Sequence, residues 1–145
     1  MNFTKFTDES KYLINDSQNK TIESSNQQIM PEHLLKVMFD KKTEVFNEIT
    51  TTIGTNFDEI NERLINGINI FPKVSGENIN ILFSSDLLKV FDKSLTSLKV
   101  FNDLFVSPDV IFYAMFNIKG SNISKILSDS GVEDKKLKAT IISYR

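Results

Sequence analysis

Large apolar residues recur along the chain at the three- and four-residue spacing of amphipathic helices. The pattern is clearest between residues 84 and 101, which carry Leu87, Phe91, Leu95, Leu98 and Phe101. It is weaker between residues 7 and 25, where polar side chains dominate. Residues 31–39 and 108–116 are apolar nearly all round, which is typical of helices in the centre of a domain. The chain is therefore predicted to be all-α.

The two apolar segments belong to an internal duplication. Pro31 and Pro108 are 77 residues apart (108 − 31), and the same offset pairs Gly54 with Gly131 without any gap. An apolar match of this length is the signature of a repeated structural unit. We expect two tandem four-helix repeats related by a pseudo-twofold axis, eight helices in all. The predicted boundaries are about 7–70 for repeat 1 and about 84–145 for repeat 2, within one domain of residues 1–145.

Proline, glycine and serine mark the expected ends of these helices. Pro31 and Pro108 stand at a first helical position, where the missing N–H of proline has no intrahelical partner to lose. Gly54 and Gly131 stand where a helix would end in the left-handed conformation that glycine adopts most easily. Ser107 is the expected cap of the helix that begins at Pro108.

Residues 71–83 are expected to connect the two halves. Proline and glycine in the segment Phe-Pro-Lys-Val-Ser-Gly at 71–76 break the helical pattern, and Ile79 and Ile81 alternate as in a short extended segment. A freely flexible linker would be more polar. We therefore expect an ordered connector that packs against both halves, because its apolar side chains would be costly to leave in water.

The overall composition is that of a soluble globular protein, with 40% hydrophobic and 25% charged residues in a chain of 145. A net charge of −2 provides no basic patch, which argues against nucleic acid as a partner. The sequence lacks the run of about 18 apolar residues that a membrane span needs, and its N-terminus is not a signal peptide. Cysteine is absent, so disulfides and thiolate chemistry are excluded, and the cytoplasm is the default compartment.

Candidate catalytic or metal-binding residues are few. His33 is the only histidine, and the sequence offers neither a nucleophile elbow nor a cysteine or second histidine to accompany it. The closest match to a phosphate-binding loop, residues 120–125, lacks the second glycine of that motif. We therefore expect no catalytic residue, metal site or cofactor in this chain, and a structural role for His33. A small hydrolase or metal enzyme built around His33 is the least favoured alternative.

The chain resembles the Clp N-terminal repeat domain. The features that carry the resemblance are Pro-Glu-His-Leu-Leu at residues 31–35 with Ile29 before it, the two glycine-stopped helices and the duplicated layout. The connector at residues 71–76 resembles the Leu-Pro-x-Val-x-Gly connector of the ClpB branch rather than those of the ClpA or ClpC branches. The resemblance extends from Thr7 to about Tyr144.

The resemblance implies a function in protein disaggregation. ClpB-type proteins are cytoplasmic, ring-forming AAA+ chaperones that use ATP to extract polypeptides from aggregates. Their N-terminal domain engages unfolded or aggregated polypeptide and delivers it to the ring. For this chain the implied partners are such polypeptides and a parent hexamer, with ATP and magnesium bound elsewhere in the parent and the isolated domain a monomer. Docking of an adaptor protein, as in ClpA- or ClpC-type proteases, is the alternative.

The resemblance also implies a substrate site between the two halves. Its polar positions correspond to Thr7, Asp103 and Asp109, although Thr7 and Asp109 are equally good helix-start residues and Asp103 suits an exposed turn. Val90 and Val110 are expected in the apolar wall of the groove, where core packing is the competing role. Two further positions of that wall, at which some relatives carry leucine, are polar here: Lys93 and Ser97.

Overall fold

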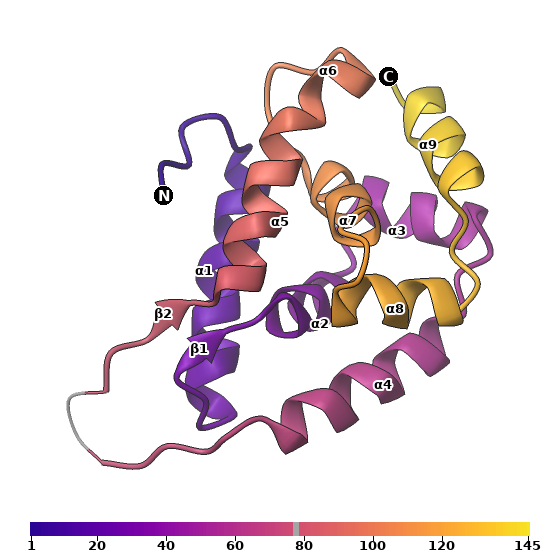
Figure 1. The fold of residues 1–145 in the computed structure, drawn as a ribbon. Helices are drawn as coiled ribbons and strands as arrows, with labels where there is room; N and C mark the ends of the chain where they lie inside the picture. Colours follow the sequence, from indigo (N-terminus) through magenta and orange to yellow (C-terminus); the bar gives the residue numbers. More distant parts are fainter. Residues whose placement is uncertain (77–78) are drawn as a thin grey trace.

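The computed structural model describes residues 1–76 and 79–145, which form helices joined by short loops (Figure 1). The elements of the first half are α1 (Asp8–Glu23), β1 (Gln28–Ile29), α2 (Pro31–Lys41), α3 (Glu44–Thr52) and α4 (Phe57–Ile70). Those of the second half are β2 (Leu82–Phe83), α5 (Ser85–Thr96), α6 (Leu98–Phe101), α7 (Pro108–Phe116), α8 (Asn122–Asp129) and α9 (Asp134–Ser143). The predicted all-α fold is confirmed.

The predicted helix at residues 84–101 is divided at Ser97 into α5 and α6, so the expected eight-helix layout has its fifth helix in two segments. The Ser97 hydroxyl donates to the carbonyl of Lys93 at 2.6 Å, and the Ser97 N–H is shared between the carbonyls of Lys93 and Ser94. Hydroxyl side chains compete with the helical ladder in this way, which favours a break. The short α6 then ends at Asn102 in a left-handed conformation (φ 55°).

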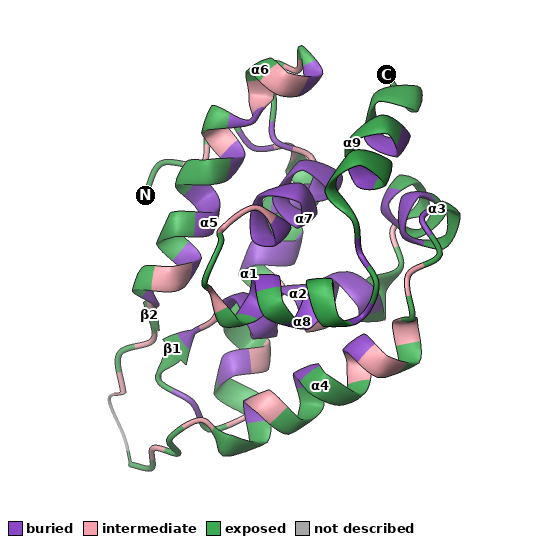
Figure 2. Cartoon of the chain, turned by 45° about the vertical axis from the view of Figure 1, so that its right-hand side comes forward, coloured by how far each residue is buried: buried purple, intermediate pink, exposed green. Residues whose placement is uncertain are grey.

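The two proline-started helices, α2 and α7, lie at the centre of the molecule (Figure 2). Every residue of α7 is buried, as its uniformly apolar sequence predicts. Helix α7 packs against α5, α8 and α9 of its own half and against α2 and α3 of the other half. Phe112 of α7 makes edge contacts with Phe39 and Phe46 of the first half. The two halves therefore share one core.

Two short parallel pairings join the halves and display the pseudo-twofold relation. In β1 and β2, Ile29 is the partner of Phe83, and an isolated bridge pairs Phe6 with Val106. The offset of 77 residues (108 − 31) maps Phe6 onto Phe83 and Ile29 onto Val106. The two pairings are therefore the same interaction with the halves exchanged, which confirms the predicted repeat architecture.

Most of the predicted helix ends are observed. Gly54 and Gly131 have φ angles of +72° and +92°, in the left-handed region that favours glycine. The side chain of Thr7 caps α1 by accepting the N–H of Ser10 at 3.1 Å. Ser107 occupies the cap position of α7, but its side chain makes no capping hydrogen bond because the hydroxyl instead donates to the carboxylate of Asp109. The predicted capping role of the Ser107 side chain is therefore wrong.

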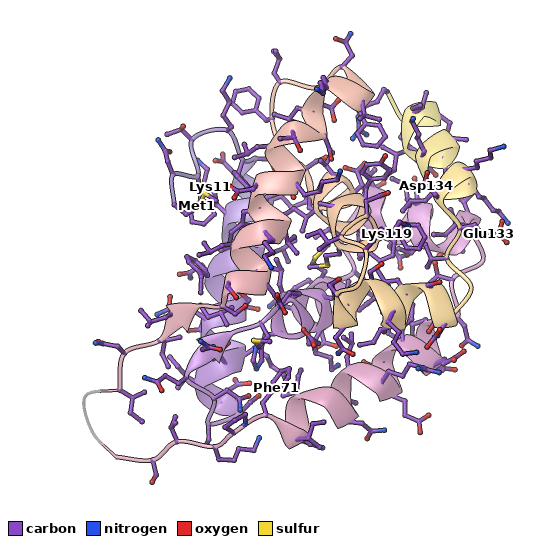
Figure 3. All side chains as sticks on the ribbon, viewed as in Figure 1. Met1, Lys11, Phe71, Lys119, Glu133 and Asp134 are labelled. Atoms are coloured by element: carbon purple, nitrogen blue, oxygen red, sulfur yellow. The ribbon has the colours of Figure 1, made fainter. Side chains whose placement is uncertain are left out.

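The predicted connector is ordered where the structure describes it; of its residues, 77 and 78 lie outside the described residues. Its first residue, Phe71 (labelled in Figure 3), follows α4. The ring of Phe71 lies against His33 of α2, with ring centroids 5.5 Å apart. Its last residue, Phe83, contacts Phe91 of α5 at a centroid distance of 5.4 Å. The connector thus packs against both halves, as its apolar residues predict.

Candidate functional site

An open cleft of about 530 Å³ lies where four separate segments of the chain meet. Its walls come from Thr7 and Glu9 at the start of α1, residues 44–46 at the start of α3, the loop between α6 and α7, and the residues that follow α9. The side chains around it include four acids, Glu9, Glu44, Asp103 and Asp109, and a single base, Arg145. We call it the acidic cleft.

Three of the five predicted site residues line the acidic cleft: Thr7, Asp103 and Asp109. Thr7 combines this position with the capping of α1, so its expected alternative role is also observed. Asp109 lies in the first turn of α7 and is only 2% exposed. Asp103 is not the freely solvated turn residue of the alternative interpretation, because its side chain is only 14% exposed and is held in an ion pair.

Arg145 joins the two aspartates in one ion-pair network. Its Nε donates to both carboxylate oxygens of Asp103, at 2.8 and 3.0 Å. Its Nη1 and Nη2 donate to the two carboxylate oxygens of Asp109, at 2.9 and 3.0 Å. The fork of the guanidinium matches a carboxylate in this bidentate manner, and charge-assisted hydrogen bonds of this kind are the strong ones. The network fixes the positions of three side chains that line the cleft.

Arg145 remains charged in this environment. Partial burial acts to lower the pKa of its guanidinium, but the hydrogen bonds and charges of Asp109 and Asp103 outweigh burial and raise that pKa. The ion pairs are also partly shielded from solvent, since the side chain of Arg145 is 25% exposed and that of Asp109 is 2% exposed. Pairs in such surroundings are screened less by salt than pairs on an open surface.

The structure places the other two predicted site residues in the core. Val90 on α5 and Val110 on α7 are both 0% exposed, so neither forms part of an exposed apolar wall, and this placement corrects the prediction. The reason is helical spacing: Val90 follows Leu87 by three positions and shares its buried face. Ser97 is buried as well, whereas Lys93 is exposed. The outer face of α5 therefore differs from the expected apolar groove.

Apolar surface at the acidic cleft comes instead from the loop that follows α6. Leu104 is 77% exposed and Phe105 is 51% exposed, and both line the cleft. Sequence reasoning missed these two residues, although two adjacent large apolar residues outside the helical stripe are a usable signal. It also missed Arg145, whose partner Asp109 lies 36 residues earlier in the chain. No local pattern predicts a contact of that kind.

His33 lies in the core, with a hydrogen-bond partner for each ring nitrogen. Nδ1 accepts the N–H of Met30 at 2.9 Å, which leaves Nε2 to donate to Oδ1 of Asn26 at 2.9 Å. Burial, with smaller contributions from Lys20 and Lys73, lowers the pKa of His33 to about 4. These contacts are those of a structural histidine.

Neither a metal-binding cluster nor a membrane-spanning helix is present among the described residues. Within residues 1–76 and 79–145, no group of three or more histidine, aspartate or glutamate side chains is arranged to hold a metal ion. Among the described helices, none combines the length and the apolar character that crossing a membrane requires.

Comparison with known sequences identifies the family. Residues 5–130 match the family described as the Clp repeat (R) N-terminal domain. The chain belongs to this family. The chaperone ClpB of Rickettsia felis is 33% identical over 147 residues, an alignment that covers 100% of this chain and 17% of that protein. The resemblance predicted from the sequence, including its ClpB character, is therefore confirmed, and this Clp N-domain spans about a sixth of the length of its ClpB relatives.

Solved structures share the fold at low sequence identity. The Hsp104 N-terminal domain from Candida albicans has a TM-score of 0.80 and 18% identity, covering 97% of this chain and 91% of that one. A complex of the ClpV N-domain with a VipB peptide has a TM-score of 0.78 and 19% identity, covering 97% of this chain and 89% of that one. At these identities the likeness concerns the fold alone.

Proposed function

We propose that this Clp N-domain is the substrate-engaging module of a ClpB-type, ATP-dependent protein disaggregase. In this proposal the domain captures unfolded or aggregated polypeptide at the acidic cleft and delivers it to an AAA+ ring of the longer protein. The chain contributes binding rather than catalysis. ATP and magnesium are bound by the ring, which is a cytoplasmic hexamer, and the isolated domain is a monomer.

One observation carries the proposal: Thr7, Asp103 and Asp109 come from separate segments and converge on one open cleft. The same cleft exposes Leu104 and Phe105, and exposed apolar side chains grouped beside polar ones are typical of a binding surface. An open site with a mixed lining suits partners of many sequences, because it does not depend on a shape-matched pocket for one side chain.

Titration of the 15N-labelled domain with a reduced, permanently unfolded polypeptide tests the proposal. We expect amide signals of Thr7 and residues 102–109 to shift more than those of the rest of the domain. Replacing Leu104 by serine is expected to weaken binding about tenfold or more, since full burial of a leucine contributes about 1.5–3 kcal/mol. The matched control is Ile70→Ser, which removes a similarly exposed apolar side chain (84%) that does not line the acidic cleft. Absence of shifts at the cleft at high ligand excess would refute the proposal.

Docking of a defined adaptor or partner protein is the second candidate. It is supported by the solved complex of a ClpV N-domain, which has the same fold, with a VipB peptide. This candidate predicts strong preference for one partner sequence and no competition from unrelated unfolded chains. Competition by several unrelated unfolded polypeptides for the same cleft signals would favour disaggregation instead.

A further inference from the structure

The first half of the domain contains a counterpart of the acidic cleft. The offset of 77 residues maps Asn26, Gln27, Gln28 and Met30 onto four residues that line the acidic cleft: Asp103, Leu104, Phe105 and Ser107. Those first-half residues line a cleft of about 360 Å³, whose remaining walls come from the connector and β2. We call it the connector cleft. The duplication has therefore produced two related clefts, each lined in part by the corresponding loop of one half.

A non-helical segment of the chain itself forms one wall of the connector cleft. This segment, Phe71–Val74, begins in an extended conformation at Phe71 (φ −63°, ψ 147°). The N–H of Val74 donates to the carbonyl of Ser25 at 2.8 Å, and Nδ2 of Asn26 donates to the carbonyl of Pro72 at 3.1 Å. The segment is thus held by its main chain, through one C=O and one N–H that are two residues apart.

The residue that precedes Asp103 of the acidic cleft offers an equivalent acceptor for a main-chain N–H. Asn102 corresponds to Ser25 in the offset, and both residues take the same left-handed conformation, with φ angles of 55° and 57°. Ser25 follows α1 and precedes Asn26, and Asn102 follows α6 and precedes Asp103. The carbonyl of Asn102 is therefore the counterpart of the carbonyl that binds Val74.

In the acidic cleft, the counterpart of the Asn26 side-chain donor comes from a residue that does not correspond to Asn26 in the offset. Asp103 takes the place of Asn26, and an ionised carboxylate accepts hydrogen bonds but donates none. Asp103 instead binds Nε of Arg145, and the guanidinium brings its own donors to this position. Of the five N–H groups of Arg145, those on Nε and Nη2 and one on Nη1 are used by Asp103, Asp109 and Ser107, which leaves one N–H on Nη1.

We propose that Arg145 and Asn102 together bind the main chain of an extended polypeptide segment in the acidic cleft. The free Nη1–H of Arg145 donates to a carbonyl of the segment, and the carbonyl of Asn102 accepts the N–H two residues further on, as in the connector cleft. Asp103 and Asp109 act through Arg145 as positioning residues. The proposal rests on the proposed function and specifies what the cleft recognises, namely the main chain of an unfolded polypeptide.

A comparison of exposed side chains in the two clefts supports an unfolded polypeptide as the ligand of the acidic cleft. At positions 27 and 28 of the connector cleft the exposed side chains are the polar Gln27 and Gln28, and the exposed Leu82 (57%) of the same cleft comes from β2. At the equivalent positions of the acidic cleft, Leu104 and Phe105 are exposed instead. Apolar side chains at this position gain free energy when a further segment covers them. Main-chain hydrogen bonds combined with non-directional apolar contacts suit a site that accepts many sequences.

A direct role for the aspartates makes the opposite prediction. If Asp103 and Asp109 themselves bound a basic side chain of the substrate, Arg145 would compete with the substrate for them. Removal of Arg145 would then strengthen binding, and a substrate without basic residues would bind poorly. If Arg145 is the donor, its removal weakens binding, and neutral and basic substrates bind alike.

The test uses the full 145-residue chain and an unstructured 15-residue peptide of leucine, phenylalanine, serine and glycine, with and without a central arginine. For both peptides, Arg145→Gln is expected to raise Kd roughly tenfold, the effect of one hydrogen bond to a charged group. The matched control is Arg63→Gln, because Arg63 also pairs with two acids, Glu59 and Asp129, but lies outside the cleft. Tighter or unchanged binding by a folded Arg145→Gln variant would overturn the proposal.

A second measurement does not depend on the folding of any variant. The unmodified domain is titrated with a series of the neutral peptide in which each amide in turn is replaced by an ester, which removes one N–H and weakens one carbonyl acceptor. At least one ester is expected to lower affinity several-fold, and equal affinity across the series would overturn main-chain recognition. If cleft signals shift but these predictions fail, only this inference is wrong. If neither peptide shifts them, the proposed function fails as well.

Discussion

Lowering the pH from 6.5 to 4 is expected to destabilise this domain through His33. In the folded chain the pKa of His33 is lowered from 6.5 to about 4, chiefly by burial and to a lesser extent by Lys20 and Lys73. Protonation would also place a hydrogen on Nδ1, which already faces the N–H of Met30. His33 is therefore protonated at a higher pH in the unfolded chain than in the folded chain.

The sign and size of the effect follow from proton linkage. Between pH 6.5 and 4 the unfolded chain carries a proton on His33 and the folded chain does not, so stability rises with pH across this window. The contribution is fully present above pH 6.5 and is lost as the pH falls towards 4. At about 1.4 kcal/mol per pH unit, the difference in pKa (6.5 − 4) corresponds to roughly 3 kcal/mol.

Urea denaturation of the wild-type chain and of His33→Gln, at intervals between pH 4 and 8, measures this contribution. Glutamine is neutral, and its amide can accept from Met30 and donate to Asn26 as the imidazole does. Carboxylate titrations are common to both chains and cancel in the difference between their free energies of unfolding. That difference is expected to change by roughly 3 kcal/mol in favour of the variant as the pH falls. Parallel curves would refute the assignment of a lowered pKa to His33.

Three further predictions concern stability and are measured by thermal or urea unfolding. Gly54→Ala and Gly131→Ala are each expected to cost about 1 kcal/mol, since the φ angles of both glycines are positive. The added methyl groups meet no atom within 4 Å, so the cost comes from the backbone alone. Gly67→Ala, inside α4, is the control and should stabilise the domain by about 0.5–1 kcal/mol. Phe112→Ala is expected to cost about 3–5 kcal/mol in a single transition, because its ring packs on Phe39 and Phe46 across the two halves; two separate transitions in the wild type would contradict a shared core. Ser84→Ala should cost about 1 kcal/mol through loss of its hydrogen bond to the N–H of Leu87, whereas the exposed Ser85→Ala should be nearly neutral, and equal effects of the two would contradict the capping role.

The helical stripes, the proline starts and the glycine stops could be predicted because they depend on interactions between residues close in sequence. Pro31, Pro108, Gly54 and Gly131 occupy the predicted positions for this reason. The duplication extended the prediction to the pseudo-twofold architecture, since equivalent apolar patterns with the same spacing form equivalent helices. Local reasoning was wrong at Ser97, where a hydroxyl competes with the helical ladder, and at Ser107, whose hydroxyl binds a side chain instead of capping its helix.

The candidate site was only partly predictable from the sequence. Thr7, Asp103 and Asp109 were named through the family resemblance, and the fold brings them to one cleft. Val90 was expected in the apolar wall of a groove, with core packing as the competing role, and the structure shows it in the core. An apolar residue on a helix packs in the core unless the neighbouring elements leave it uncovered. The sequence of one helix does not show which other elements will pack against it.

The sequence by itself determined that this chain is a duplicated, helical Clp N-domain, and the structure shows that the duplicated loops line two related clefts. Only the tertiary structure decided how the clefts differ. Residues 71, 72 and 74 form a wall of the first, whereas the residues after α9 bring Arg145 beside Asp103 and Asp109 in the second. The physical reason is that helices form from neighbouring residues, whereas an ion pair across 36 or 42 positions exists only after the helices have packed.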